Sequence, residues 1–187
     1  MQLRPLSLHD IRSAADWMRR KDVFQWLDFE GSTQSLDELT LKVMTQRPQH
    51  CLRVFTDDAT ETAIGLVALS RIDPRMRSAQ LWCVLGESAY SGEGYATRAV
   101  AALLDQAFRQ LDLDSVCAWV VETNEAALRI LDNNGFRAAG RLRQAHRLHG
   151  VAVDRLYFDV LASEWAERSA TAKVADARPG VGQAGRS

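Results

Sequence analysis

The centre of the chain holds two apolar strands joined by a glycine-rich loop and a long amphipathic helix. A strand is expected at residues 78–85, and residues 95–111 place apolar side chains at helical spacing. The run at residues 115–121 is continuously apolar, as expected of a strand covered on both faces. Strand, helix and strand in this order predict a crossover with parallel strands. A fold for this chain must therefore contain an α/β unit.

The segments on either side of this unit predict a mixed sheet. Further strands are expected at residues 2–6, 51–56, 62–72, 141–148 and 151–161. His149-Gly150 marks the turn of the last hairpin, because glycine supplies the positive φ that a tight turn requires. Helices are expected after Ser7 and Ser35, each with an acidic residue three positions later, and at residues 125–133. The expected fold is α/β, with a mostly antiparallel sheet around a central parallel crossover.

Length and composition bound the domain organisation and the partners. The 187 residues are 47% hydrophobic and 25% charged, which is ordinary for one globular domain. The net charge of -1 argues against a nucleic-acid partner, and no apolar run approaches the ~18 residues of a membrane span. Residues 167–187 lack aromatic side chains and are rich in Ala, Gly, Arg and Ser. We therefore expect one domain over residues 1–166 and a flexible tail over residues 167–187.

The cysteines give no sign of metal or disulfide chemistry. Cys51, Cys83 and Cys117 are odd in number and widely spaced, and each lies in an apolar run. We expect three buried thiols, with neither a disulfide framework nor a metal site. The first residues lack the basic start and long apolar stretch of a secretory signal, so the expected location is a reducing cytoplasm.

The loop at residues 88–97 is the strongest functional signal in the sequence. Gly92, Gly94 and Ala96 leave the backbone without bulk where a helix begins, so that successive N–H groups can face outward. With the partial positive charge of the helix N-terminus they would form an anion site suited to a pyrophosphate. The alternative is a tight connection that needs glycine only for its backbone angles. The spacing matches neither a P-loop nor a dinucleotide-binding Rossmann motif.

Two motifs in this part of the chain resemble the GNAT N-acetyltransferase superfamily. Residues 91–96 (Ser-Gly-Glu-Gly-Tyr-Ala) resemble its CoA pyrophosphate loop, Arg/Gln-x-x-Gly-x-Gly/Ala, although the leading Arg or Gln is absent. Residues 124–136 are similar to a second family motif. The matching positions are Asn124, Ala127, Gly135 and Phe136. Residues 140–143 and the closing Glu164-Trp165 resemble the subgroup of ribosomal-protein alanine N-acetyltransferases, and the whole resemblance covers residues 1–166.

The resemblance implies that acetyl-CoA donates an acetyl group to a primary amine by direct attack, without a metal. It also implies that strands 78–85 and 115–121 splay apart, with the pantetheine arm in the gap. The cofactor-binding residues that it implies are Val84, Leu85 and Gly86 beside the arm, Asn124 facing it, and Gly92, Glu93, Gly94, Tyr95, Ala96 and Thr97 at the pyrophosphate. The thioester oxygen needs a donor as charge develops, and a backbone N–H of the first strand could supply it.

Few polar side chains remain for acid–base catalysis. Many members of the family that this chain resembles have a tyrosine at the position of Leu131 and a glutamate at the position of Gln80 or Ala139. Glu122, two residues before Asn124, is the remaining acid that we expect to act as a base or to hold a water. The alternative is that Glu122 is only an exposed strand end.

The acceptor side of the expected site gives two opposite signals. Trp26 and Phe29 are expected to bind the acceptor, and the two acids within residues 24–30 would suit a cationic amine. Residues 137–150 hold four Arg, two His and no acid, which would attract an anionic acceptor. Core packing of the aromatic rings and a solvated hairpin face are the plainer alternatives.

The expected function is a cytoplasmic, acetyl-CoA-dependent N-acetyltransferase, a monomer or homodimer, whose acceptor is a protein N-terminal amine or a small amine. An amino sugar or an amine antibiotic is an alternative acceptor. A non-catalytic acyl-CoA-binding module is the alternative from another class, because Leu131, Gln80 and Ala139 replace polar residues. A third hypothesis is a scaffold protein that binds partners through Arg141 and Arg143 of the basic hairpin.

Overall fold

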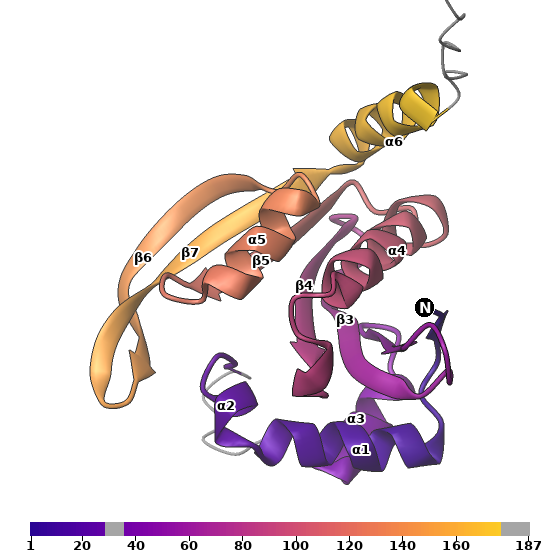
Figure 1. Ribbon diagram of the computed structural model, residues 1–187. Helices are drawn as coiled ribbons and strands as arrows, with labels where there is room; N and C mark the ends of the chain where they lie inside the picture. The colour runs from indigo at the N-terminus through magenta and orange to yellow at the C-terminus, as the bar shows by residue number, and fades with distance from the viewer. Residues whose placement is uncertain (29–35, 177–187) are drawn as a thin grey trace, which may run out of the picture.

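The computed structural model describes residues 1–28 and 36–176 (Figure 1). Its strands are β1 (Leu3–Arg4), β2 (Cys51–Thr56), β3 (Ala63–Asp73), β4 (Ser78–Leu85), β5 (Ser115–Val121), β6 (Arg137–Leu148) and β7 (Val151–Leu161). Its helices are α1 (Leu8–Arg19), α2 (Lys21–Phe24), α3 (Glu38–Thr45), α4 (Tyr95–Arg109), α5 (Glu125–Asn133) and α6 (Ala162–Asp176), with a 3-10 helix at Ser88–Tyr90. The unit expected at the centre of the chain consists of β4, α4 and β5.

The described strands form one seven-stranded sheet in the order β1-β2-β3-β4-β5-β7-β6. The β4–β5 pair is parallel, and the other neighbouring strands are antiparallel. Helix α4 connects β4 to β5, which is the crossover that the sequence predicts. The expected fold class, α/β with a mixed and mostly antiparallel sheet, is therefore confirmed.

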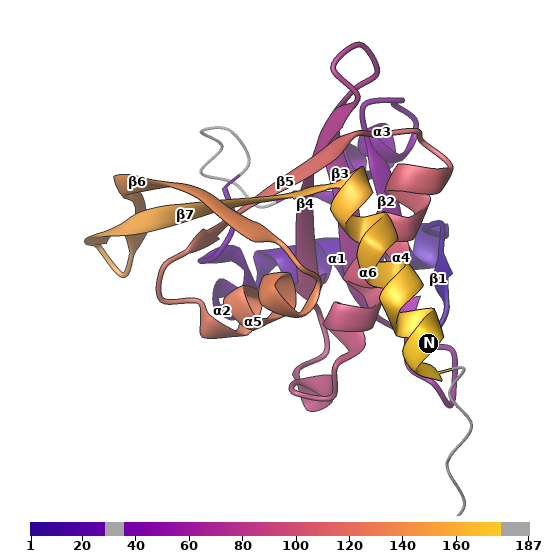
Figure 2. The same ribbon diagram turned by 90° about the horizontal axis from the view of Figure 1, so that it is seen from above.

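Helices cover both faces of the sheet and bury two apolar clusters. Helix α4 buries Leu103 and Leu104 against one face, together with Val67 of β3. Helices α1 and α3 bury Met18 and Leu41 against the other face. Figures 1 and 2 show α5 beside α4, whereas β6 and β7 extend past the helices as a long hairpin. The central strands thus lie between two helical layers.

Strands β4 and β5 separate soon after they begin. Their pairing covers three residue pairs and ends at Gln80 and Cys117. Beyond that point β5 stays paired with β7 as far as Val121, and β4 stays paired with β3 as far as Leu85. Each strand is therefore held by its other neighbour while the two diverge. This is the splay that the family resemblance implies.

Three local sequence signals are found at the ends of elements. Ser7 and Asp10 form a reciprocal capping box at the start of α1. Gly135 follows α5 with a φ of 74°. The hairpin turn places both His149 and Gly150 in the left-handed region, with φ values of 52° and 83°. Two consecutive positive φ angles give the tight two-residue turn that the sequence predicts.

Two predictions about elements were wrong in detail. The side chain that caps α3 is Asp37, which accepts a hydrogen bond from the Thr40 N–H at 2.8 Å, whereas Ser35 lies outside the described residues. Strand β5 is not covered on both faces, because Val116 is buried but Cys117 is exposed. The reason is that α1 and α3 pack over β2, β3 and β4 and leave this part of β5 open.

Helix α6 extends beyond the expected domain boundary. Residues 167–176, which the composition assigns to a tail, are helical. Trp165 anchors this helix, because its Nε1–H donates to Asp105 of α4 at 2.9 Å and its ring centroid lies 6.5 Å from that of Phe108. Alanine has the highest helix propensity, so an Ala-rich segment readily continues a helix that tertiary contacts have started. Residues 177–187 lie outside the described part of the chain.

Candidate active site

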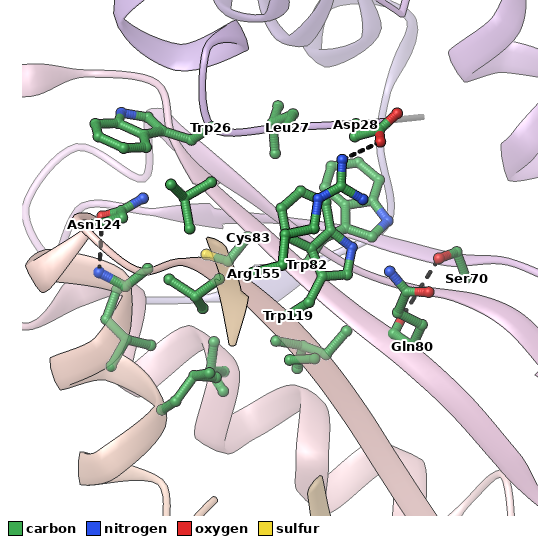
Figure 3. Close-up of a pocket in the computed structure, with 18 of the residues that line it drawn as sticks. Trp26, Leu27, Asp28, Ser70, Gln80, Trp82, Cys83, Trp119, Asn124 and Arg155 are labelled. Atoms are coloured by element: carbon green, nitrogen blue, oxygen red, sulfur yellow. Dashed lines mark hydrogen bonds and ion pairs between the residues drawn. The ribbon is translucent and has the colours of Figure 1, made fainter. Parts of the chain in front are cut away.

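A cavity of about 560 Å³ opens where β4 and β5 diverge (Figure 3). Its walls include Val100 of α4 and Leu131 of α5 on one side of the sheet. On the other side they include Trp26 and Asp28, which follow α2. The cavity therefore joins the two helical layers through the gap in the sheet.

Alternation along the two strands explains how side chains from both faces reach this cavity. On β5, Ala118 and Val120 belong to the apolar cluster under α4, so Trp119 between them points to the opposite face. On β4, Leu81 belongs to the same cluster and Trp82 packs against the cluster under α1. All five residues line the cavity. Because the strands diverge, both sides of each strand border one continuous space.

The glycine-rich loop presents an open helix N-terminus. Gly94 is the N-cap of α4 with a φ of 78°, and no side chain caps the helix there. A Cβ placed on Gly92 or Gly94 would meet no atom within 4 Å. The Arg98 N–H donates to the Gly94 carbonyl at 3.0 Å, so the amides of residues 95–97 precede the first helical hydrogen bond. These amides and the helix dipole fit the diphosphate of CoA.

The side chains of this loop have separate roles. Tyr95 is buried, and its hydroxyl accepts a hydrogen bond from the Asp58 N–H at 3.3 Å. Arg98 lies 4.6 Å over the Tyr95 ring and pairs with the Asp58 carboxylate at 2.9 Å. Glu93 is exposed. The Tyr95 side chain therefore fixes the loop to the core, and residue 95 can offer an anion only its backbone.

The β4 residues predicted to lie beside the pantetheine arm are not part of the described cavity lining. Val84 is buried under α1. The Gly86 N–H donates to the Ile64 carbonyl at 2.8 Å, and a Cβ on Gly86 would overlap the Trp17 ring. Gly86 is therefore needed for close packing, and its amide is already used. The β4 residues in the lining are Gln80, Leu81, Trp82 and Cys83, so Leu85 also lies beyond it.

The two polar residues predicted at the end of β5 both have protein partners. Asn124 lines the cavity and caps α5, because its Oδ1 accepts a hydrogen bond from the Ala127 N–H at 3.1 Å. Glu122 is outside the described lining. Its carboxylate accepts hydrogen bonds from Arg141 Nη2 at 2.9 Å and from the Asp154 N–H at 3.0 Å. These bonds tie β5 to the hairpin, so the geometry does not support Glu122 as a base.

The basic hairpin carries its own counter-ions. Arg141 pairs with Glu122 and with Asp154. The Gln144 N–H donates to the Asp154 carboxylate at 2.8 Å, and this bond, with Arg141, holds the pKa of Asp154 below its usual value. Arg141 and Arg143 both lie outside the described lining of the cavity. Their charge is therefore not placed to receive an acceptor there.

Arg155 lines the cavity on the same side as Trp26 and Asp28. Its guanidinium lies 4.2 Å over the Trp119 ring and pairs with Asp28 (Figure 3). Its Nη2 also donates to His146 Nδ1 at 3.4 Å, while the His146 Nε2–H donates to the Gln25 carbonyl at 2.7 Å. We refer to Gln25, Asp28, His146 and Arg155 as the latch. The latch joins the segment after α2 to the β6–β7 hairpin.

The sequence predicted part of this wall of the cavity, but not all of it. Trp26 lines the cavity as expected, whereas Phe29 lies outside the described residues. Arg155 was missed because its partner Asp28 is 127 positions away in the chain. The signal that could have found it is strand alternation, since β5 and β7 pair Trp119 with Tyr157 and so place alternate residues of both strands on one face.

The cysteines of the site are not poised for nucleophilic catalysis. Desolvation raises the pKa of the Cys83 thiol to about 12, so this thiol is protonated at neutral pH. Cys51 is buried, Cys83 is half-buried and Cys117 is exposed, which corrects the expectation of three buried thiols. Within residues 1–28 and 36–176, no group of three or more His, Cys, Asp or Glu side chains could hold a metal ion.

Comparison with known proteins identifies the family of this fold and site. A family model described as an acetyltransferase (GNAT) domain matches residues 1–137. The chain belongs to the GNAT acetyltransferase family. GNAT acetyltransferases take the acetyl group from acetyl-CoA, so this chain is an acetyl-CoA-dependent N-acetyltransferase. Among the described elements, no helix is long and apolar enough to cross a membrane.

Curated relatives of this GNAT acetyltransferase include enzymes for small amines. A spermidine N(1)-acetyltransferase from Vibrio cholerae is 26% identical over 170 residues, which cover 90% of this chain and 97% of that protein. A putative ribosomal N-acetyltransferase, YdaF of Bacillus subtilis, is 27% identical but covers only 54% of this chain and 55% of its own. The ribosomal-protein subgroup is therefore supported only over about half of the chain.

A solved GNAT structure has the same fold. The spermidine N-acetyltransferase from Vibrio cholerae in complex with CoA and spermine superimposes with a TM-score of 0.77 at 24% identity. The match covers 88% of this chain and 97% of that chain. At 24% identity, this match shows that the two proteins share the same arrangement of helices and strands.

Proposed function

We propose that this GNAT acetyltransferase acetylates the primary amine of a small molecule that enters the cavity from the side of Trp26. The observation that carries the proposal is the cavity itself, which joins the α4 side of the sheet, at Val100, to the Trp26 side through the gap between β4 and β5. A thioester and an amine that enter from opposite layers would meet in this gap. Holding two reactants in line supplies much of the acceleration of a bimolecular transfer.

The protein groups around the gap suit direct attack. The amine nitrogen bonds to the thioester carbon, the carbon–sulfur bond breaks, and CoA leaves as a thiol. The pKa of Cys83 disfavours an acyl-cysteine intermediate, because its thiolate is scarce at neutral pH. In the described part of the chain, β4 is not paired with β5 beyond Gln80. The backbone N–H groups on this side of β4 are therefore available to donate to a developing oxyanion.

The cavity walls favour an amine with an apolar or planar body. Trp26, Trp82, Trp119 and Tyr157 supply aromatic surface. Asp28 is the carboxylate in the described lining, and Arg155 pairs with it. We therefore expect a small amine with one cationic centre to be a better acceptor than a polyamine, although the Vibrio cholerae relative is a spermidine N(1)-acetyltransferase.

A thiol-release assay with acetyl-CoA tests the proposed function. The amines would be spermidine, an amino sugar, an arylalkylamine and a peptide with an N-terminal alanine. We expect amine-dependent release of CoA, highest with a small apolar amine. Thermal stabilisation by acetyl-CoA without any amine-dependent release would favour a non-catalytic acyl-CoA-binding module. Light scattering of the same sample would test the expected monomer or homodimer.

A further inference from the structure

We propose that His50 is the general base that accepts the proton of the acceptor amine. This inference rests on the proposed function, because it assigns a role within the same cavity. His50 lines the cavity, at the residue before β2. It is not one of the positions that the family motifs of this sequence mark.

Strand pairing places His50 beside two other polar side chains. Cys51 of β2 pairs with Leu69 of β3, so His50 lies next to Ser70. Ser70 in turn pairs with Gln80 of β4, and the Ser70 hydroxyl donates to the Gln80 carbonyl at 3.4 Å. All three polar residues line the cavity. We refer to His50, Ser70 and Gln80 as the polar border of the cavity.

This polar border faces the acceptor side of the sheet. Leu52, two residues after His50, belongs to the apolar cluster under α1. Trp82, two residues after Gln80, packs against the same cluster. Because side chains alternate along a strand, His50 and Gln80 point to that same face. Trp26 approaches the cavity from this side. An amine that enters past Trp26 is therefore on the same face of the sheet as the polar border.

The imidazole of His50 is neutral and able to take a proton. Its Nδ1 is buried and has no hydrogen-bond partner among the described residues. Burial, followed by the charge of Arg47, holds the pKa of His50 below its usual value of about 6.5. Arg47, from the turn after α3, is the charged group that acts on His50, and Asp28, Arg71 and Arg155 line the same cavity.

The other acids and thiols near the cavity are less suitable as bases. Asp28 is engaged by Arg155 in the latch. Glu122 lies outside the described lining and is held by Arg141. Cys83 is protonated at neutral pH, since its pKa is raised to about 12. Among the described lining residues, His50 is thus the group whose neutral form can accept a proton at physiological pH.

The proton balance of the step is simple. As the amine nitrogen bonds to the thioester carbon, the electron pair of the carbon–sulfur bond leaves with the CoA sulfur. The amine proton passes to an imidazole nitrogen of His50 through waters along the polar border, because His50 lies two strands away from β4. The imidazolium then releases this proton to solvent, and the departing thiolate is protonated from solvent.

The test compares His50→Gln with the wild type over a range from about pH 5 to about pH 9. General bases contribute on the order of 10²–10⁴-fold, so we expect the kcat of His50→Gln at neutral pH to fall by about 10²-fold or more. Protonation of the amine lowers the activity of both proteins at acidic pH, and the wild-type profile should fall more steeply because His50 is protonated as well. The KM for acetyl-CoA should not change.

Two further variants keep the test specific. His9→Gln alters an exposed histidine of α1 and should keep the wild-type profile. His50→Ala should regain activity as imidazole is added, because a free imidazole can occupy the space of the missing ring. A His50→Gln profile with the kcat of the wild type and the same steepness at acidic pH would overturn the inference alone. Absence of turnover by the wild type with every amine would overturn the proposed function and this inference together.

Discussion

Asp10 is a carboxylate that is almost fully buried, at 2% exposure, and fully paired. It accepts hydrogen bonds from Arg4 Nη1 at 2.6 Å and from the Ser7 N–H at 2.7 Å. Burial opposes its ionisation, but the hydrogen bonds from Arg4 and Ser7 outweigh burial and hold the pKa of Asp10 below its usual value. A carboxylate with a lowered pKa stabilises the fold above its unfolded pKa of about 4 and loses this effect as pH falls through the folded pKa.

The Asp10→Asn variant tests this contribution. Hydrogen bonds to a charged group are worth about 1.5–3 kcal/mol, so we expect the free energy of unfolding at neutral pH to fall by about 1–3 kcal/mol. Urea unfolding at several pH values would measure it. The difference between the proteins should be constant above about pH 5 and should shrink below about pH 4. A difference that grows toward acidic pH would contradict the assignment.

Single residues also show where sequence reasoning succeeds and fails. The positions of Gly94 and Gly135 could be predicted, because a positive φ or an open loop backbone is a local requirement. The partners of Glu122 could not be predicted, because Arg141 and Asp154 are brought to it by strand pairing. His50 and Arg155 were missed for the same reason, since only the sheet register places them at one cavity.

At the scale of elements, the start of α4 is the expected site for the CoA diphosphate. Gly94→Asp and Gly94→Asn form a matched pair, because both side chains tolerate a positive φ and differ in charge. We expect Gly94→Asp to weaken acetyl-CoA binding about tenfold more than Gly94→Asn, since the added carboxylate would repel the diphosphate and occupy the helix N-terminus. Calorimetric titration would measure both affinities. Equal affinities for the two variants would argue against a diphosphate at this loop.

The latch is the second element-scale feature, because it joins the segment after α2 to the hairpin. Asp28→Asn weakens the ion pair between residue 28 and Arg155, and the Arg155 side chain is only 15% exposed. We expect the KM of the acceptor to rise on the order of tenfold, with the KM of acetyl-CoA unchanged, because Trp26 would be less firmly held. Asp22→Asn removes an exposed pair with Arg20 and is the control, since such pairs contribute little. Equal effects of the two substitutions on the acceptor would contradict a role for the latch.

At the scale of the whole molecule, the order of the strands and of helices α1, α3, α4 and α5 could be derived from periodicity with turn and cap signals, whereas α2 and α6 were not predicted. Strands β2, β4 and β5 and helix α5 have the predicted bounds, because each is delimited by local turn and cap signals. The cavity could not be derived in this way. It depends on β4 leaving β5 after Gln80 while β3 and β7 hold the two strands apart, and register between distant strands has no local signal.

In the proposed function, the divergence of β4 and β5 is the feature that creates the acetyl-transfer site. A crystal structure of the protein with CoA would test this most directly. We predict the diphosphate at the amides of residues 95–97 and the thiol end of CoA in the gap beyond the Gln80–Cys117 pair. The cavity on the Trp26 side should remain open for the amine. CoA bound away from this gap, or β4 and β5 paired along their full length, would contradict the account.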